Sequence, residues 1–184
     1  MNWGSSALNC VLGGGADSNE TITRVPNFTA QGRRDASLVV SKTGSIGQRL
    51  TWVSGSGSAK VFNFASDGIN RKFTNSSNVS TFDFTSSTFG NIQITGTNRS
   101  GRVMTGGILR VRDNINNVTC DYVPTNVTWA VPACNCPSQG SWSATCTRAD
   151  SSTYSTSLVI NGCGIGLYTE GSSTNDVKFD RCGS

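Results

Sequence analysis

Short β-prone segments dominate this sequence. Stretches of about four to eight residues, rich in Val, Ile, Thr and aromatics, recur about every 8–12 residues, as in a sandwich or barrel. The two phenylalanines of Thr81–Thr85 share one face of an extended segment, as do the Val and Trp residues of Asn126–Val131. No window of a dozen residues has apolar side chains at helical spacing. We therefore expect an all-β fold, an antiparallel β-sandwich or β-barrel of short strands.

The segments that carry this pattern define the expected strands, with Gly-rich breakers between them, such as Gly106–Gly107. We predict strands at Ser37–Ser41, Arg49–Ser54, Lys60–Phe64, Thr81–Thr85, Asn91–Thr95, Ile108–Arg112, Asn117–Tyr122, Asn126–Val131, Trp142–Arg148, Ser155–Ile160 and Asp176–Asp180. The alternating glycines of Gly162–Gly166 predict a bulge or a close crossing of backbones near Cys163.

The composition favours a folded chain with a polar surface. Only 14% of the residues are charged and 35% are hydrophobic, yet the chain has eight Phe, four Trp and three Tyr, which argues against disorder. Ser, Thr, Asn and 21 Gly take the remaining places. We expect a single β-rich domain over residues 1–184, in which residues 118–184 form either a disulfide-rich subdomain or a pinned end of the same sandwich.

Seven cysteines are present, and six of them follow residue 118: Cys10, Cys120, Cys134, Cys136, Cys146, Cys163 and Cys182. They contain no Cys-x-x-Cys pair, which disfavours zinc, so we expect disulfides, mainly in the C-terminal third. Three bridges can form, and the sequence does not decide their connectivity. Cys10 is the expected odd cysteine, although it could instead pin the N-terminal segment to the domain.

Disulfides indicate an oxidising compartment, and we expect an extracellular or cell-surface location. No apolar run approaches the roughly 20 residues of a membrane span, and residues 1–11 lack a signal peptide's basic head and apolar stretch, so we expect a soluble chain without its leader. Asn-x-Ser/Thr sequons agree with a secreted glycoprotein and occur at Asn19, Asn27, Asn75, Asn78, Asn98, Asn117 and Asn126.

The absence of histidine removes Ser-His-Asp and Cys-His catalysis as well as imidazole metal sites. An Asp-dependent hydrolase remains an alternative, for which Asp176 with Asp180, or Asp113 with Asp121, supply carboxylates. Asp is also among the commonest turn residues, and that structural explanation is preferred. We expect no cofactor and no catalytic residues.

The net charge of +4 comes from basic residues spread along the chain, which disfavours nucleic acid as a partner. Four of these residues form a candidate basic patch, namely Lys60, Arg102, Arg110 and Arg112. Scattered solvating charge is the alternative explanation.

Aromatic residues supply the candidate ligand-binding site. Trp52, Trp129 and Trp142 lie in predicted strands, where packing in the core is the default. Exposed aromatic rings beside polar groups are typical of sugar-binding surfaces, because the ring stacks on the ligand and the polar groups orient it. The candidates are Trp3, Tyr154, Asn161 and Tyr168.

Two resemblances accompany this pattern. The stretch from Gly140 to Cys146 and on through Ser157–Asn161 resembles one repeat of the cyanovirin-type lectins over about an eighth of the chain, without the partner repeat. A Ser/Thr/Gly/Asn-rich head with late cysteines is similar to surface pilins, without the apolar N-terminal helix of type IV pilins. Neither resemblance assigns a role to a residue.

From these features we expect a non-enzymatic extracellular or cell-surface subunit, a building block of a pilus, filament or adhesin that acts by assembly and surface binding. Its partners would be copies of itself or other surface subunits. The first alternative is a carbohydrate-binding module or lectin with a glycan ligand. The second is the Asp-dependent hydrolase.

Overall fold

The computed structural model describes residues 21–24, 28–31, 39–43, 47–75, 77–98, 100–130, 134–179 and 182. These residues contain no α-helix, only a 3-10 turn, η1 (Gly57–Ala59). The strands are β1 (Thr21–Arg24), β2 (Phe28–Gln31), β3 (Val39–Thr43), β4 (Gln48–Ser54), β5 (Val61–Ser66), β6 (Ile69–Thr74), β7 (Ser80–Phe89), β8 (Ile92–Thr95), β9 (Arg102–Thr105), β10 (Ile108–Asp113), β11 (Val118–Trp129), β12 (Gln139–Thr147), β13 (Thr153–Gly162), β14 (Ile165–Glu170) and β15 (Ser173–Lys178). The predicted all-β, antiparallel class is confirmed.

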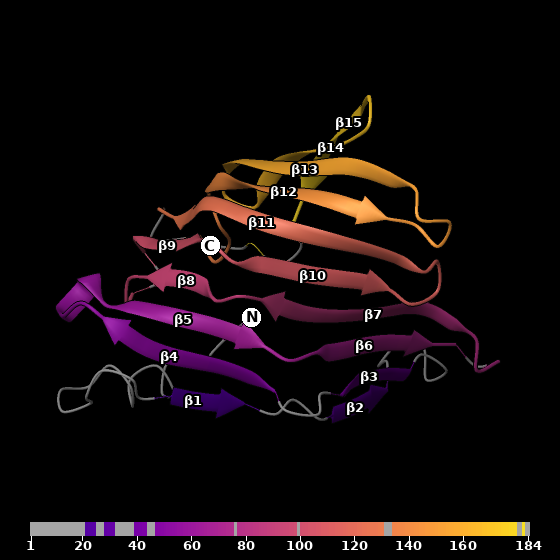
Figure 1. Ribbon diagram of the computed structural model, residues 1–184, viewed down its shortest axis with the longest axis horizontal. Coiled ribbons are helices and arrows are strands. Elements are labelled where there is room, and N and C mark those ends of the chain that lie inside the picture. Colours follow the sequence, from indigo (N-terminus) through magenta and orange to yellow (C-terminus); the bar gives the residue numbers. More distant parts are fainter. Residues whose placement is uncertain are drawn as a thin grey trace.

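One hydrogen-bonded network joins all the described strands. Its order is β1-β4-β5-β8-β9-β11-β10-β7-β6-β3-β2, and β12 to β15 continue one after another from the other edge of β11. Figure 1 shows β4, β5, β8 and β9 on one side, β3, β6, β7 and β10 on the other, and β11 to β14 above both. Long β11 holds the halves together, because β10 pairs with its first residues and β9 with its last.

The two halves are linked by a line of bends. β5 and β6 follow each other with two residues between them, and so do β7 and β8, and β9 and β10. Backbone with positive φ recurs where the chain passes from one half to the other, and the residues are Gly47, Gly68, Gly90, Gly106, Gly107, Asn126 and Gly140. We call this line the crease. Bends and bulges of this kind let strands turn a corner and let a sheet curve.

Gly107 shows why glycine is needed in the crease. Its φ is 65°, and an added Cβ would lie 2.6 Å from the carbonyl oxygen of Asn91. Gly140 is similar, because a Cβ there would collide with the backbone of Asn126. A side chain at either position would therefore push neighbouring strands apart.

The main core lies on one face of β4, β5 and β8. Leu50, Phe62, Phe64 and Ile92 are each at most 4% exposed. Leu50 lies opposite Phe64, which lies opposite Ile92, so the cluster is built by register across three strands. Each such side chain contributes about 1.5–3 kcal/mol on burial. Residues on the other face of β5 are half-buried, as the predicted alternation requires.

Most predicted strands that fall on described residues are present, with shifted ends. The segments predicted at Asn117–Tyr122 and Asn126–Val131 are one strand, β11, because the bulge between Thr125 and Thr128 takes up the irregularity that suggested a turn. The bulge predicted near Cys163 is confirmed by the register shift between Ile160 and Gly162. Strands β1, β2, β6, β9 and β14 were not predicted, since these short, charged or Gly-containing segments lack a clear alternation.

Three disulfides confirm the prediction for the C-terminal third. They are Cys120–Cys146, Cys134–Cys163 and Cys136–Cys182. The first joins directly opposed residues of β11 and β12. The other two hold the segment before β12 against the β13–β14 turn and against residue 182. Cys10 lies outside the described residues.

Candidate functional site

All three tyrosines of the chain lie on one face of the β11–β14 sheet. Tyr122 comes from β11, Tyr154 from β13 and Tyr168 from β14. Trp142 of β12 lies opposite Leu158, which lies opposite Tyr168, so the tryptophan shares this face. All four aromatic side chains are half-buried. We call these four residues the aromatic face.

Hydrogen bonds and charges connect the tyrosines. The hydroxyl of Tyr168 donates to Glu170 Oε2 at 3.0 Å. Burial raises the pKa of Tyr122, and nearby Tyr168, Tyr154 and Glu170 raise it further. Burial also raises the pKa of Tyr168, so both hydroxyls are neutral at pH 7 and able to donate. The guanidinium of Arg148 lies 4.1 Å from the ring centroid of Tyr154.

This arrangement offers rings and polar groups on one surface. Tyrosine and tryptophan present an apolar body with a polar tip, so they can stack on a ligand and hydrogen-bond to it. The carboxylate of Glu170, which is exposed, adds acceptor capacity beside the rings. The rings are held by strands cross-linked through the Cys120–Cys146 disulfide, which limits the conformational cost of binding.

The structure brings together two of the predicted ligand-binding residues, Tyr154 and Tyr168. Tyr168 lies within β14, a strand that was not predicted. Asn161 is exposed and follows Ile160 in β13, so it points to the opposite face of the sheet. Trp3 lies outside the described residues.

Sequence reasoning missed Tyr122, Trp142 and Glu170 as members of this surface. Trp142 was expected in the core, and it is half-buried beside the tyrosines on a face that also carries the buried Ala144 and Thr156. Alternation within each strand could have placed Tyr122 and Trp142 on one face of their own strands. Only the pairing of the strands shows that these faces coincide.

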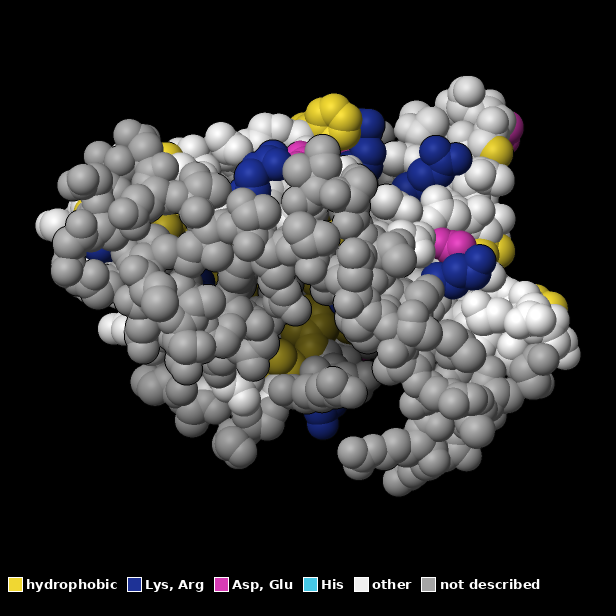
Figure 2. All heavy atoms as spheres, turned by 90° about the horizontal axis from the view of Figure 1, so that it is seen from below, with side chains coloured by type: hydrophobic (Ala, Val, Ile, Leu, Met, Phe, Trp, Pro, Cys, Tyr) yellow, Lys and Arg dark blue, Asp and Glu magenta, His cyan; other side chains and the backbone are white. Residues whose placement is uncertain are grey.

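The four residues of the candidate basic patch lie in two separate places. Arg102 is opposite Trp129 near the end of β11, whereas Arg112 is opposite Thr119 near its start, roughly 30 Å away along the strand. Lys60 lies near Arg102. The carbonyl of Lys60 accepts a hydrogen bond from the backbone nitrogen of Gly96, and the carbonyl of the next residue, Thr97, accepts one from the Arg102 guanidinium. Figure 2 shows described basic side chains as separate spots, some of them beside carboxylates.

Two of these cations, Lys60 and Arg110, are also in close contact with neighbouring side chains. The ammonium of Lys60 lies 3.7 Å from the centroid of a Trp52 ring. Arg110 donates to both carboxylate oxygens of Asp121 at 2.7 Å, and its guanidinium lies 4.1 Å from the Phe89 ring centroid. Arg110 and Arg112 lie two positions apart and so share one face of β10, but the charge of Arg110 is neutralised by Asp121.

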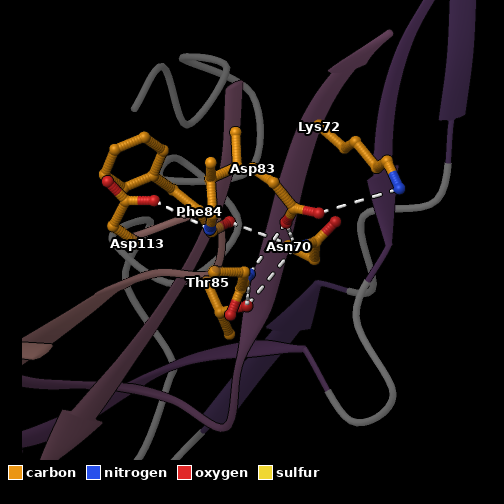
Figure 3. Close-up of polar contacts among 8 residues, drawn as sticks. Asn70, Lys72, Asp83, Phe84, Thr85 and Asp113 are labelled. Carbon is orange, nitrogen blue, oxygen red and sulfur yellow. Dashed lines mark hydrogen bonds and ion pairs between the residues drawn. The ribbon is translucent and has the colours of Figure 1, made fainter. Parts of the chain in front are cut away.

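A cluster of polar side chains surrounds Asp83 of β7 (Figure 3). The amides of Asn70 and Asn114 donate to Asp83 Oδ1 at 2.7 and 2.8 Å, and Lys72 Nζ lies 3.7 Å from Asp83 Oδ2. Burial opposes ionisation of Asp83, but these contacts outweigh it and hold the pKa below its usual range. The cluster joins β6, β7 and the turn after β10.

Asp113 is the second carboxylate of this region. It accepts from the backbone nitrogens of Ile115 and Asn116 at 2.9 and 3.1 Å and so closes the β10–β11 turn. Burial opposes its ionisation, yet the hydrogen bonds lower its pKa as well. A glycosidase pair needs one protonated carboxyl, whereas Asp83 and Asp113 are both ionised at neutral pH.

The aspartates named from the sequence are also engaged locally or exposed. Asp121 is ion-paired with Arg110, which is on the adjacent strand, and Asp176 is exposed on β15. Asp180 lies outside the described residues. These positions give the hydrolase alternative no support. Within the described part of the chain, no group of three or more Cys, Asp or Glu side chains could hold a metal ion.

The fold and this surface together define a disulfide-bonded, antiparallel all-β protein with an aromatic sheet face. No protein-family model matches the chain, and no curated protein or solved structure matches it at a significant level. Three disulfides are typical of proteins from an oxidising, extracellular environment. Over the described ranges, no helix has the length and apolarity needed to cross a membrane.

Proposed function

We propose that this protein is an extracellular or cell-surface adhesive module that binds carbohydrate through the aromatic face. The observation that carries the proposal is the convergence of four half-buried aromatic side chains from four consecutive strands. Sugar rings have an apolar face of C–H groups and a rim of hydroxyls. An aromatic ring complements the face, and the Tyr168–Glu170 pair offers a hydrogen-bonding partner for the rim.

The test is binding to a glycan array, followed by titration calorimetry with the glycans that bind. We expect Tyr168→Ala and Trp142→Ala each to lower the affinity about tenfold, which is the effect of losing roughly 1.4 kcal/mol at a central contact. Ile115→Ala is the control, because it removes an exposed apolar side chain (45%) from the β10–β11 turn. Its affinity should equal that of the wild type.

Two results would contradict the proposal. One is an array on which no glycan binds the folded protein. The other is unchanged affinity of both aromatic variants for a glycan that does bind.

We also propose, as a second candidate, a role as a pilus or filament building block. The supporting observation is the edge of β15, since among the described strands β15 pairs only with β14. An open edge can receive a strand from another chain. Asp176 and Lys178 on this edge weaken the case, because charged residues protect edges from such pairing. Light scattering over a range of concentrations tests it, and a constant monomer mass would exclude it.

A further inference from the structure

The face of the β11–β14 sheet opposite the aromatic face contains an open hollow of about 390 Å³. This volume is within the range of small-molecule sites. The hollow is lined by Asp121, Val123, Ser143, Ala144, Thr145, Ser155, Thr156, Ser157, Thr169 and Gly171. Five hydroxyl side chains of this lining lie on the face of the hollow, namely Ser143, Thr145, Ser155, Ser157 and Thr169.

The register of the strands aligns the hydroxyl side chains in rows that run across β12, β13 and β14. Ser143 of β12 lies opposite Ser157 of β13, which lies opposite Thr169 of β14. Thr145 and Ser155 form a second, parallel row. Paired positions on neighbouring strands are about 4.8 Å apart, so the hollow presents closely spaced groups that can each donate and accept.

The single charged residue of the lining is Asp121. Arg110 donates one hydrogen bond to each of its carboxylate oxygens, which fixes the orientation of the carboxylate. An ionised carboxylate has about four acceptor sites, so about two remain for a ligand. Hydrogen bonds from Arg110 lower the pKa of Asp121, and the group stays ionised at neutral pH.

This lining selects a class of ligand. Anions are disfavoured because the only charged lining group is negative. A metal ion would find one carboxylate that is already ion-paired. An apolar ligand would meet one apolar side chain, Val123, among the hydroxyls, because Ala144 lies opposite Tyr122 and points to the aromatic face. A neutral polyol fits, since its own hydroxyls are both donors and acceptors.

We propose that this hollow is a second carbohydrate-binding site, so that the protein is bivalent, with one site on each face of the same sheet. The proposal extends the carbohydrate binding proposed for the aromatic face, but it uses different residues. Thr156 borders the hollow through its backbone, because its register with Ala144 and Glu170 places its side chain on the aromatic face. Sites on opposite faces cannot be occupied by one short glycan, so they would cross-link two glycan chains.

The experiment is amide chemical-shift mapping by NMR, with cellobiose, lactose and maltose titrated at millimolar concentrations. We expect at least one of the three to shift the amides of β12, β13 and β14 that line the hollow, with saturation. Thr145→Val with Thr169→Val removes two hydroxyls and keeps β-branched side chains in the strands. This double variant should weaken binding at the hollow at least fivefold.

Thr147→Val is the matched control, because Thr147 is exposed on the same strand and face as Thr145 but does not line the hollow. It should bind as the wild type does.

Shifts at the hollow without shifts at the aromatic face would support this site and contradict the function proposed above. Shifts confined to the aromatic face would overturn the second site and leave the first intact. Equal affinity of the double variant and the wild type would also overturn it, because the hydroxyls would then bind water only.

Discussion

The crease predicts that two adjacent glycines differ sharply in their tolerance of a methyl group. Gly106 and Gly107 have nearly the same backbone angle, with φ of 67° and 65°. An added Cβ at Gly106 meets nothing within 4 Å. At Gly107 it would lie 2.6 Å from the oxygen of Asn91 and 2.7 Å from the nitrogen of Ile92. Alanine at each position therefore separates backbone strain from steric overlap.

The expected magnitudes follow from these contacts. A left-handed conformation costs an L-residue roughly 1–2 kcal/mol, and the reduced freedom of the unfolded chain offsets about 0.4–1 kcal/mol of this. Gly106→Ala should thus lower the free energy of unfolding by about 1 kcal/mol. Gly107→Ala adds an overlap with backbone, typically about 1–3 kcal/mol, so its loss should be about 2–4 kcal/mol.

The assay is equilibrium unfolding in urea under oxidising conditions, with intact disulfides and linear extrapolation to water. The slope of the free energy against urea should be the same for both variants. Equal losses for Gly106→Ala and Gly107→Ala would refute the reasoning, since the crease would then not hold the strands in close contact at Gly107.

Three further predictions concern stability, each read from urea unfolding. Asp83→Ala should cost about 1–2 kcal/mol, because it removes one hydrogen bond from each of two part-buried amides, which keep longer contacts to Thr85 Oγ1, and a loss below about 0.5 kcal/mol would contradict this. The folded-state pKa of Tyr122 is raised, so its contribution is complete below about pH 10, the unfolded value, and is lost as the pH rises from there through the higher folded-state pKa. Tyr122→Phe should flatten this alkaline loss, and an unchanged profile would contradict it. Removal of the Cys136–Cys182 disulfide, which spans 46 residues, by serine at both positions should cost roughly 4 kcal/mol, and retention of full stability would argue against its role in pinning residue 182.

Local patterns were sufficient to predict the class of the fold. Alternation in segments such as Thr81–Thr85 depends only on neighbouring residues, and β7 contains that segment. The prediction was weakest where a strand is charged or interrupted by glycine. The segment of β6, with Arg71 and Lys72, does not resemble a buried strand, yet it pairs with β3 and β7 on both edges. Pairing with these two strands holds β6 in the sheet, and the sequence pattern within β6 alone does not show that pairing.

The candidate site was predicted in part for the same reason. Tyr154 and Tyr168 were named from residue type alone, and the structure adds Tyr122 and Trp142 to the same surface. Membership depends on register, because a shift of one residue in any of the four strands would turn its ring to the other face. Register is set by turns and bulges far from the rings.

The amino-acid sequence by itself determined an extended, antiparallel chain whose late cysteines can be oxidised, since alternation and cysteine content act within a few residues. Only the tertiary structure decided which cysteines pair, where the crease runs, and which side chains share the aromatic face and the hollow behind it. Those properties arise between residues distant along the chain, and hydrogen-bond register across the sheet determines which of them meet.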